Sequence, residues 1–515
     1  MDCAHSSPRA DRFSRATRRD VAVYIYELPP ELTLVPMSSK TGVDLMYTAE
    51  LRFLETLQQD TAVRTLDPED ADLFFVPLLS YWNARANVGC PRAQLELVLG
   101  YIKGRYPFWR RSSGHDHVIF ACNDMGGCGL GPVLGPAILV THFGLAASFE
   151  SFLDVGRQRS LNATVLREQM LSGKWCYSPH KDVVIPPVVG PADQSATPPD
   201  PYRSIETRLV HAGGIWGWSN KGLHHVTRYS QGMKQGLWLH YEAWRNSNGS
   251  AIASVPFGHP VTCFAVNTSR CAAHAAAEPS PWKDELRPLR VQPGELKLLM
   301  TVTPGHLPGE AFSSAAMCFS SSGEGFGQRT TRFALNGCVP LIGQPFVDQP
   351  FEQLLPYETF SQRLEFYEFP QLPARLRALT DDRVVRMRQA LKEVSPAFNW
   401  VQQSEGRTLP ALAYNFTILQ LCQRAVQLQG VLKTGRLCSH TAAALRAATG
   451  IGGARGRSTP SHDVNSSVGN RRYLNNVVVP EWYPSELVSA VHAARRHRRE
   501  AFARARKQHS SSPLE

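Results

Sequence analysis

The sequence contains no apolar run of the ~18 residues that a membrane-spanning helix needs. Its first twenty residues have no apolar segment of the kind found in a secretory signal peptide. There is no C-x-x-C pair, and no group of histidines and cysteines has the spacing of a zinc site. No Asp-x-Asp pair stands in a suitable loop, and the adjacent Asp381 and Asp382 are expected to cap a helix. The sequence therefore predicts neither a metal site nor a required cofactor.

Charge is unevenly distributed along the 515 residues. Much of the net charge of +11 lies in two basic segments, residues 1–20 and residues 495–507. Such arms can bind nucleic acid or anionic membranes, but solvated tails are the commoner case, and we expect no nucleic-acid partner. We predict a disordered arm over 1–20 and a largely disordered basic tail over 425–515, with a possible helix at 484–507. With 43% apolar residues, the remainder is long enough for two or three domains with buried cores.

Cysteines and glycosylation sequons fit an extracytoplasmic setting. Five N-x-[ST] sequons occur, at Asn162, Asn248, Asn267, Asn415 and Asn465. Of the eleven cysteines, the pairs Cys122/Cys128 and Cys263/Cys271 each flank a short loop. Either pair is a candidate local disulfide, and the alternative for each is a pair of buried free thiols.

The first half of the chain alternates strand and helix patterns. Strands are expected at 21–26, 72–77, 118–121, 137–140 and 181–187, with helices at 44–59 and 92–106. This alternation predicts an open parallel α/β sheet. A Pro-rich segment at 191–201 reads as a linker, and a strand at 207–212 opens the second half. A further helix is expected at 370–393.

Residues 317–351 carry the strongest functional pattern. An apolar run leads into a glycine-rich loop at 321–327, which is followed by a helical segment at 328–335 and a second apolar run at 338–342. Strand, loop, helix and strand in this order form a parallel βαβ unit. Glycines before a helix leave backbone N–H groups free to face an anion, and Arg329 could add a bidentate contact to phosphate. The alternative, which is equally open, is that this loop only connects the strand to the helix.

Several motifs resemble one known family. The run R-x-x-x-F-A-x-x-G-C-V-P-L-I that begins at Arg329, followed by Pro350 and Phe351, resembles the signature of exostosin-type glycosyltransferases (glycosyltransferase family 47). Residues 67–77, 106–117 and 181–187 resemble further segments of that family in the same order. Plant and green-algal members are the most similar. The sequence departs from the family pattern at Arg332 and Pro345, where acidic residues are expected.

The resemblance implies an α/β fold of two Rossmann-like lobes facing across a cleft (GT-B type). Residues 21–205 would form the acceptor lobe, and residues 206–424 the nucleotide-sugar lobe. The implied reaction transfers a sugar, with inversion, from a nucleoside diphosphate sugar to a cell-wall or extracellular-matrix glycan, without a metal. Family members are usually anchored in the Golgi membrane, so a Golgi setting is expected.

Site residues are predicted from both halves. For the donor, the candidates are Gly213, Gly214, Gly323, Glu324, Gly325, Gly327, Arg329 and Arg332. For the catalytic base, they are Asp124, His142 and His117, of which Asp124 is favoured. The alternative function is a catalytically weak or inactive exostosin-fold subunit that binds glycan or a partner glycosyltransferase. Arg332 and Pro345 favour that alternative, because a guanidinium accepts no hydrogen bond from a ribose hydroxyl.

Overall fold

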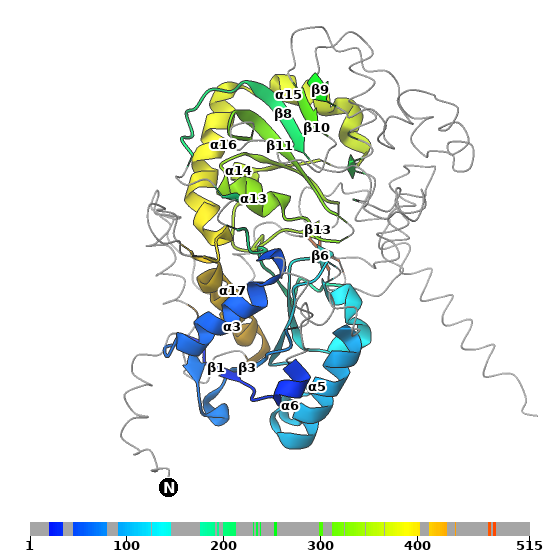
Figure 1. The fold of residues 1–515 in the computed structure, drawn as a ribbon, viewed down its shortest axis with the longest axis vertical. Helices are drawn as coiled ribbons and strands as arrows, with labels where there is room; N and C mark the ends of the chain where they lie inside the picture. The colour runs from blue at the N-terminus through cyan, green and yellow to red at the C-terminus, as the bar shows by residue number, and fades with distance from the viewer. Residues whose placement is uncertain are drawn as a thin grey trace, which may run out of the picture.

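The fold is described from a computed structural model, which shows two lobes, one above the other (Figure 1). The described residues are 20–33, 45–79, 91–124, 126–145, 176–190, 193–194, 199–212, 230, 233–234, 237, 252–254, 298–301, 312–323, 325–345, 347–364, 366–401, 411–429, 438, 472–474 and 477–479. Each lobe is built on a six-stranded sheet whose strand pairs are all parallel. The predicted α/β class with two Rossmann-like lobes is therefore confirmed.

The first sheet has the strand order β2-β1-β3-β4-β5-β7. Its strands are β1 (Val23–Ile25), β2 (Arg64–Thr65), β3 (Leu73–Val76), β4 (His117–Ala121), β5 (Ile138–Thr141) and β7 (Val183–Val184). Neighbouring residues of a strand face opposite sides, so Phe75 and Phe120 enter one core while Phe74 and Ile119 enter the other. Both faces are covered, which explains why these strands read as continuous apolar runs.

Helices fill the two faces of this sheet. Helix α3 (Ala49–Gln59) places Phe53 and Leu57 in the first core, and α5 (Pro91–Arg105) places Val98 and Ile102 in the second. Smaller helices complete the lobe, namely α2 (Pro30–Thr33), α6 (Phe108–Ser112) and the 3-10 turns Leu45–Tyr47, Pro68–Asp70, Gly126–Gly129 and Gly131–Leu134. The predicted helices at 44–59 and 92–106 are confirmed.

The second sheet has the strand order β14-β12-β11-β8-β10-β9. Its strands are β8 (Thr207–Ala212), β9 (Ile252–Ser254), β10 (Leu298–Thr301), β11 (Ala315–Ser321), β12 (Pro340–Gly343) and β14 (Gln362–Arg363). The order reverses between β8 and β11, because the following strands are added on opposite sides of this pair. In open α/β sheets ligands bind beyond the carboxyl ends of the strands at such a switch point. For this lobe, the switch point lies where the loop that begins at Ser321 leaves β11.

The helices of the second lobe follow β11. They are α13 (Arg329–Leu335), α14 (Tyr357–Phe360), α15 (Leu372–Ala378) and α16 (Asp381–Val394), with 3-10 turns at Phe366–Gln371 and Ser395–Phe398. The single helix expected at 370–393 is two helices, α15 and α16, because the backbone is extended at Leu379 and Thr380. Thr380 caps α16, since its side chain accepts from the Arg383 N–H. The cap predicted at Asp381 and Asp382 was therefore placed one residue too late.

Several contacts join the lobes. Strands β6 (Gly144–Leu145) and β13 (Val347–Asp348) pair antiparallel between the two sheets (Figure 1). The Phe351 N–H donates to the Val184 carbonyl over 2.9 Å. Helix α17 (Ala413–Gln429) runs back to the first lobe, where Tyr414 contacts Phe53 with ring centroids 5.4 Å apart. Most of α17 falls inside the segment 206–424 predicted as the second lobe, yet the helix packs in the first lobe's core, and its last turn extends into the segment predicted as a disordered tail.

The cysteines do not pair as their spacing suggested. Cys128 is bonded to Cys176, and Cys122 is a buried free thiol, so the proposed Cys122–Cys128 disulfide was wrong. Two more disulfides, Cys318–Cys338 and Cys422–Cys438, join residues of the described part of the chain. Cys263 and Cys271 lie outside the described residues.

The termini are described only in part. The predicted N-terminal arm lies outside the described residues, apart from Asp20. In the basic tail the structure describes an antiparallel pair, β15 (Arg472–Leu474) and β16 (Val477–Val479). Within the described ranges, no helix has the length and apolar character needed to cross a membrane.

Candidate active site

A buried network of polar side chains supports the glycine loop that follows β11. The Ser320 and Thr330 hydroxyls lie 2.7 Å apart, and Thr330 donates to the Gln349 side chain over 2.9 Å. The Gln344 amide reaches both hydroxyls, at 3.2 and 3.3 Å. Because all four side chains are buried, their mutual hydrogen bonds avoid the cost of desolvated polar groups. The network ties β11 and α13 to the segment that enters β13.

The glycines of this loop serve close packing. A side chain at Gly327 would meet the loop's own backbone, with a Cβ only 2.5 Å from the Ser321 carbonyl oxygen. A Cβ at Gly325 would lie 1.7 Å from the carbonyl oxygen of Asp124 in the other lobe. Next to it, the Phe326 N–H donates to that same oxygen over 3.1 Å. Gly325 therefore allows the glycine loop to rest on the Asp124 loop.

Two predicted catalytic residues lie at this junction. Asp124 follows the end of β4 and is exposed, and its Oδ1 accepts a 2.6 Å hydrogen bond from the Tyr47 hydroxyl. His142 follows the end of β5, and its ring centroid lies 5.1 Å from that of Phe326. The structure thus brings Asp124, His142 and the glycine loop together.

His142 is held in the neutral form. Burial lowers its pKa from 6.5 to about 4, and the backbones of Ile185 and Met46 act in the opposite direction. The Ile185 carbonyl lies 3.1 Å from Nδ1, which assigns the ring proton to that nitrogen. Nε2 is buried and makes no hydrogen bond to any residue that the structure describes. At neutral pH this nitrogen carries a lone pair and is able to accept a hydrogen bond.

His117 lies elsewhere, contrary to the prediction. It opens β4, so it stands at the opposite edge of the sheet from Asp124, which follows the same strand. Its two ring nitrogens contact the Tyr26 hydroxyl and the Asp116 carboxylate, each at 2.7 Å. The ring is fully buried and stacks on Phe74. These contacts make His117 a core residue with no access to the junction of the lobes.

Two cations lie beside the glycine loop. Lys234 is fully buried, and its N–H donates to the Ser230 hydroxyl over 3.2 Å, while the Ser230 N–H donates to the Gly323 carbonyl over 2.9 Å. Burial, and then the positive charge of Arg329, hold the pKa of Lys234 well below its ordinary value. A negatively charged ligand placed between these side chains would remove their mutual repulsion.

Two buried hydroxyl groups lie at the start of the glycine loop. Ser321 and Ser322 are completely buried, and neither Oγ has a hydrogen-bond partner within the described part of the chain. A buried hydroxyl without a partner carries a desolvation cost of about 1–3 kcal/mol. The loop therefore combines two buried hydroxyls with two basic side chains nearby, a combination suited to an anion. Helix α13 has only seven residues, so the side chains contribute more to this charge than its dipole.

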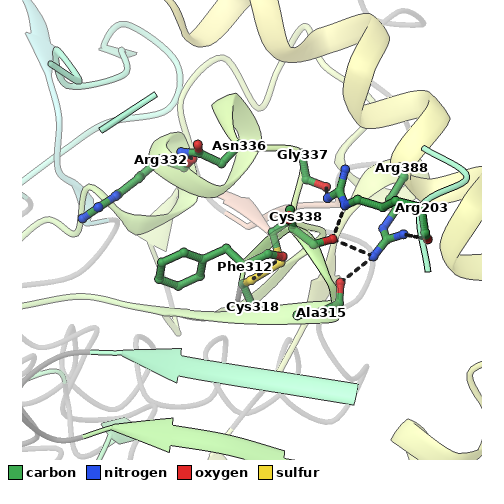
Figure 2. The surroundings of a disulfide bond; sticks show 10 residues. Arg203, Phe312, Ala315, Cys318, Arg332, Asn336, Gly337, Cys338 and Arg388 are labelled. Atoms are coloured by element: carbon green, nitrogen blue, oxygen red, sulfur yellow. Dashed lines mark hydrogen bonds between the residues drawn. A yellow bond between two sulfur atoms is a disulfide. The ribbon is translucent and has the colours of Figure 1, made fainter. Parts of the chain in front are cut away.

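Arg332 is engaged away from the glycine loop. Its guanidinium forms a 2.8 Å ion pair with Asp193 of the interlobe linker, and Asn336 donates to the Asp193 carbonyl, also over 2.8 Å. In Figure 2 the Arg332 side chain points away from Arg203 and Arg388, which bind backbone carbonyls near the Cys318–Cys338 disulfide. We therefore leave Arg332 out of the candidate donor-binding set.

The other predicted donor residues are only partly accounted for. Gly213, Gly214 and Glu324 lie outside the described residues. Gly323, Gly325, Gly327 and Arg329 all lie in the loop or at the start of α13. No cluster of three or more His, Cys, Asp or Glu side chains suited to a metal ion occurs among the residues that the structure describes.

The sequence pattern missed three residues at the junction, Tyr47, Lys234 and Phe326. Tyr47 stands in a short 3-10 turn before α3, and Lys234 in a polar stretch without a clear period, so neither position stands out. Phe326 had a usable signal, because an aromatic residue between two loop glycines is expected to pack against something. Here it packs in a small core with Phe143 and Val347.

Comparisons with known proteins agree with the motifs. The model of the Exostosin GT47 domain matches residues 17–379, more than half of the chain. The chain belongs to the exostosin GT47 family. This is the glycosyltransferase family that the motifs at 67–77 and 329–351 resemble.

Plant proteins are among the relatives of this GT47 chain. It is 36% identical over 113 residues to a probable glucuronoxylan glucuronosyltransferase of Arabidopsis thaliana, a match that covers 21% of this chain and 24% of that protein. A probable glucuronosyltransferase of Oryza sativa subsp. japonica is 22% identical over 395 residues, which are 72% of this chain and 74% of the relative. Among solved structures, TarM aligns with a TM-score of 0.28 and 9% identity, over 64% of this chain and 58% of TarM. A TM-score of this size supports no functional conclusion.

Proposed function

We propose that this chain is an inverting glycosyltransferase, which moves a sugar from a nucleoside diphosphate sugar to a hydroxyl of a cell-wall or extracellular-matrix glycan. The observation that carries this proposal is the contact of the glycine loop with the Asp124 loop. On one side of that contact lie Lys234 and Arg329, together with two buried hydroxyls that have no hydrogen-bond partner among the described residues. On the other side lie an exposed carboxylate and a neutral histidine.

The two sides match the two demands of an inverting displacement. The departing diphosphate needs positive charge and hydrogen-bond donors, which Arg329, Lys234, Ser321 and Ser322 supply. The attacking hydroxyl needs a base on the opposite side of the sugar, and Asp124 takes that role. His142 Nε2, which stays unprotonated at neutral pH, accepts a hydrogen bond from the acceptor glycan. Lobes held in contact keep donor and acceptor in line.

We propose glucuronic acid as the transferred sugar. The support is the naming of the relatives as probable glucuronosyltransferases. We also propose the Golgi lumen as the setting and a partner glycosyltransferase as a companion of the chain. Three disulfides in the described part of the chain support an oxidising compartment.

The second candidate is a catalytically weak or inactive subunit that binds glycan or a partner transferase. Arg332 and Pro345 favour it, because they stand where the family has acidic residues. The ion pair of Arg332 with Asp193 weakens that argument, since it directs the guanidinium to the linker. Arg332→Glu separates the candidates. An inactive subunit that lost donor binding through this residue should regain it in the variant.

A panel of nucleoside diphosphate sugars tests the proposal. Binding is measured by calorimetry and transfer by product analysis, for the wild-type chain and for Asp124→Asn. Asp124→Asn should bind the donor normally and lose transfer by about 10²–10⁴-fold, the usual contribution of a general base. Asp382→Asn, an exposed aspartate in the first turn of α16, is the matched control and should behave as wild type. Absence of both donor binding and transfer across the panel would refute the proposal in favour of the second candidate.

A further inference from the structure

We propose that Tyr47 is a positioning residue for Asp124, and that Gly325 and Phe326 of the opposite lobe fix both of them. This inference rests on the proposed function, because it takes Asp124 as the base. It adds a residue from the turn before α3 to the machinery, and it assigns the glycine loop a second task besides anion binding. Three interactions support it: a side-chain hydrogen bond, a backbone hydrogen bond between the lobes, and a contact between aromatic rings.

The hydrogen bond fixes the carboxylate. Asp124 is exposed, and fixing an exposed side chain in one rotamer costs conformational entropy. The Tyr47 hydroxyl donates to Oδ1 over 2.6 Å, which orients the carboxylate that would receive the acceptor's proton. Tyr47 itself is set by its turn, since both the N–H and the hydroxyl of Thr48 donate to the Leu45 carbonyl, over 3.0 and 2.8 Å. A hydrogen bond to a charged group in this short range is of the strong type.

The backbone of the other lobe fixes the main chain of Asp124. The Phe326 N–H donates to the Asp124 carbonyl over 3.1 Å, and the absence of a side chain at Gly325 permits that approach. Gly126 stabilises the same turn, because its N–H donates to the Asn123 carbonyl and its φ of 51° suits glycine. The loop that carries the candidate base is therefore held from both lobes.

The Phe326 ring contacts both Tyr47 and His142. It meets the Tyr47 ring edge-on with centroids 5.7 Å apart, and the His142 ring at 5.1 Å. Phe326 is 6% exposed and lies in a small core with Phe143 and Val347. Because one ring sets the position of both neighbours, displacement of the glycine loop would move Tyr47 and the candidate base together.

A double-mutant cycle of Tyr47→Phe and Asp124→Asn tests the assignment. Tyr47→Phe keeps the ring and removes only the hydroxyl. It should lower kcat by about 10- to 100-fold, the effect of losing a hydrogen bond to a charged group, with the donor KM unchanged. In the Asp124→Asn background the same change should have little further effect, because the group that Tyr47 positions is already inactive. Tyr202→Phe, which removes an exposed hydroxyl that accepts from Gln389 far along α16, is the matched control and should keep wild-type rates.

Three results would overturn the assignment. They are a wild-type kcat for Tyr47→Phe, an equal loss in both backgrounds, and a rise in donor KM in place of the fall in kcat. If the wild-type chain transfers no sugar at all, the proposed function fails, and amide hydrogen exchange tests the contact directly. Tyr47→Phe should then speed exchange of the Phe326 N–H, and an unchanged exchange rate would refute the contact itself.

Discussion

Replacing Lys234 by methionine should make the ligand-free protein more stable while it abolishes donor binding. Lys234 is fully buried, and burial together with the charge of Arg329 holds its pKa well below the ordinary 10.5. The folded state therefore disfavours the charged form. Methionine has a similar length and no charge, so it removes the desolvation cost and the repulsion of Arg329. A site arranged for an anionic ligand is expected to show this opposition between stability and function.

The size of the gain has an upper limit. If burying the charged amine cost more free energy than deprotonating it, Lys234 would simply lose its proton. The limit at pH 7 is therefore the free energy of deprotonation, which is set by the interval between pH 7 and the unfolded pKa of 10.5. At 1.36 kcal/mol per unit, that limit is about 5 kcal/mol. We expect a gain of about 1–3 kcal/mol in the free energy of unfolding, which corresponds to a Tm rise of about 2–4 °C per kcal/mol for a lobe of this size.

The pH dependence of the free energy of unfolding tests the same reasoning independently. Because the folded-state pKa of Lys234 lies below 10.5, the unfolded chain binds more protons between the two values. The free energy of unfolding of the wild type should therefore rise with pH across that interval. Lys234→Met should lack this part of the slope, as measured by urea unfolding at several alkaline pH values.

A lysine outside the site controls for the substitution itself. Lys392→Met, on the exposed side of α16, should change neither Tm nor donor binding. The reasoning is refuted if Lys234→Met lowers Tm, or if the variant binds the donor as tightly as the wild type in calorimetry.

Three further predictions follow from contacts already described. The folded-state pKa of His142, about 4, lies below the ordinary value of 6.5. The free energy of unfolding should therefore fall by about 3 kcal/mol as the pH is lowered from 6.5 to 4. That loss should be absent in His142→Gln and present in His115→Gln, when urea unfolding is compared at pH 7 and pH 4. Gly325→Ala should reduce transfer at least 10-fold, because its Cβ meets a carbonyl oxygen of the other lobe, whereas Gly100→Ala should stabilise α5 by about 0.5–1 kcal/mol with normal transfer. Arg388→Met should lower the free energy of unfolding by about 3–5 kcal/mol in thermal or urea unfolding, since the buried guanidinium donates to several carbonyl oxygens.

The strands of both sheets were predictable because both of their faces are buried. Continuous apolar runs at 21–26, 118–121 and 315–319 are typical of such strands, and the structure places β1, β4 and β11 there. Helix α17 was not predicted, although it fills much of the first core, because polar residues such as Gln420 and Arg424 are buried together with its apolar ones. Buried and exposed positions of this helix therefore do not separate into apolar and polar residues.

The site could be located from the sequence but not assembled from it. Asp124 and His142 were found because each follows a predicted strand, and ligands bind beyond strand ends. His117 precedes its strand, so the strand's direction alone would have excluded it. The contact of Gly325 with Asp124 joins residues two hundred positions apart, and no local pattern predicts it. The Asp193 partner of Arg332 was hidden for the same reason.

The return of α17 to the first lobe has a practical consequence for dividing the chain. Two lobes suggest two segments that could be produced separately, cut near residue 205. The first segment would then lack Tyr414, Phe416 and Ile418, which fill its core from the far end of the sequence. It would also lose Arg424, which donates to the carbonyls of Pro179 and Asp182. A shorter version that keeps the first lobe intact must therefore join residues 20–190 directly to residues 411–429. A version that simply ends at the linker would lose these core contacts.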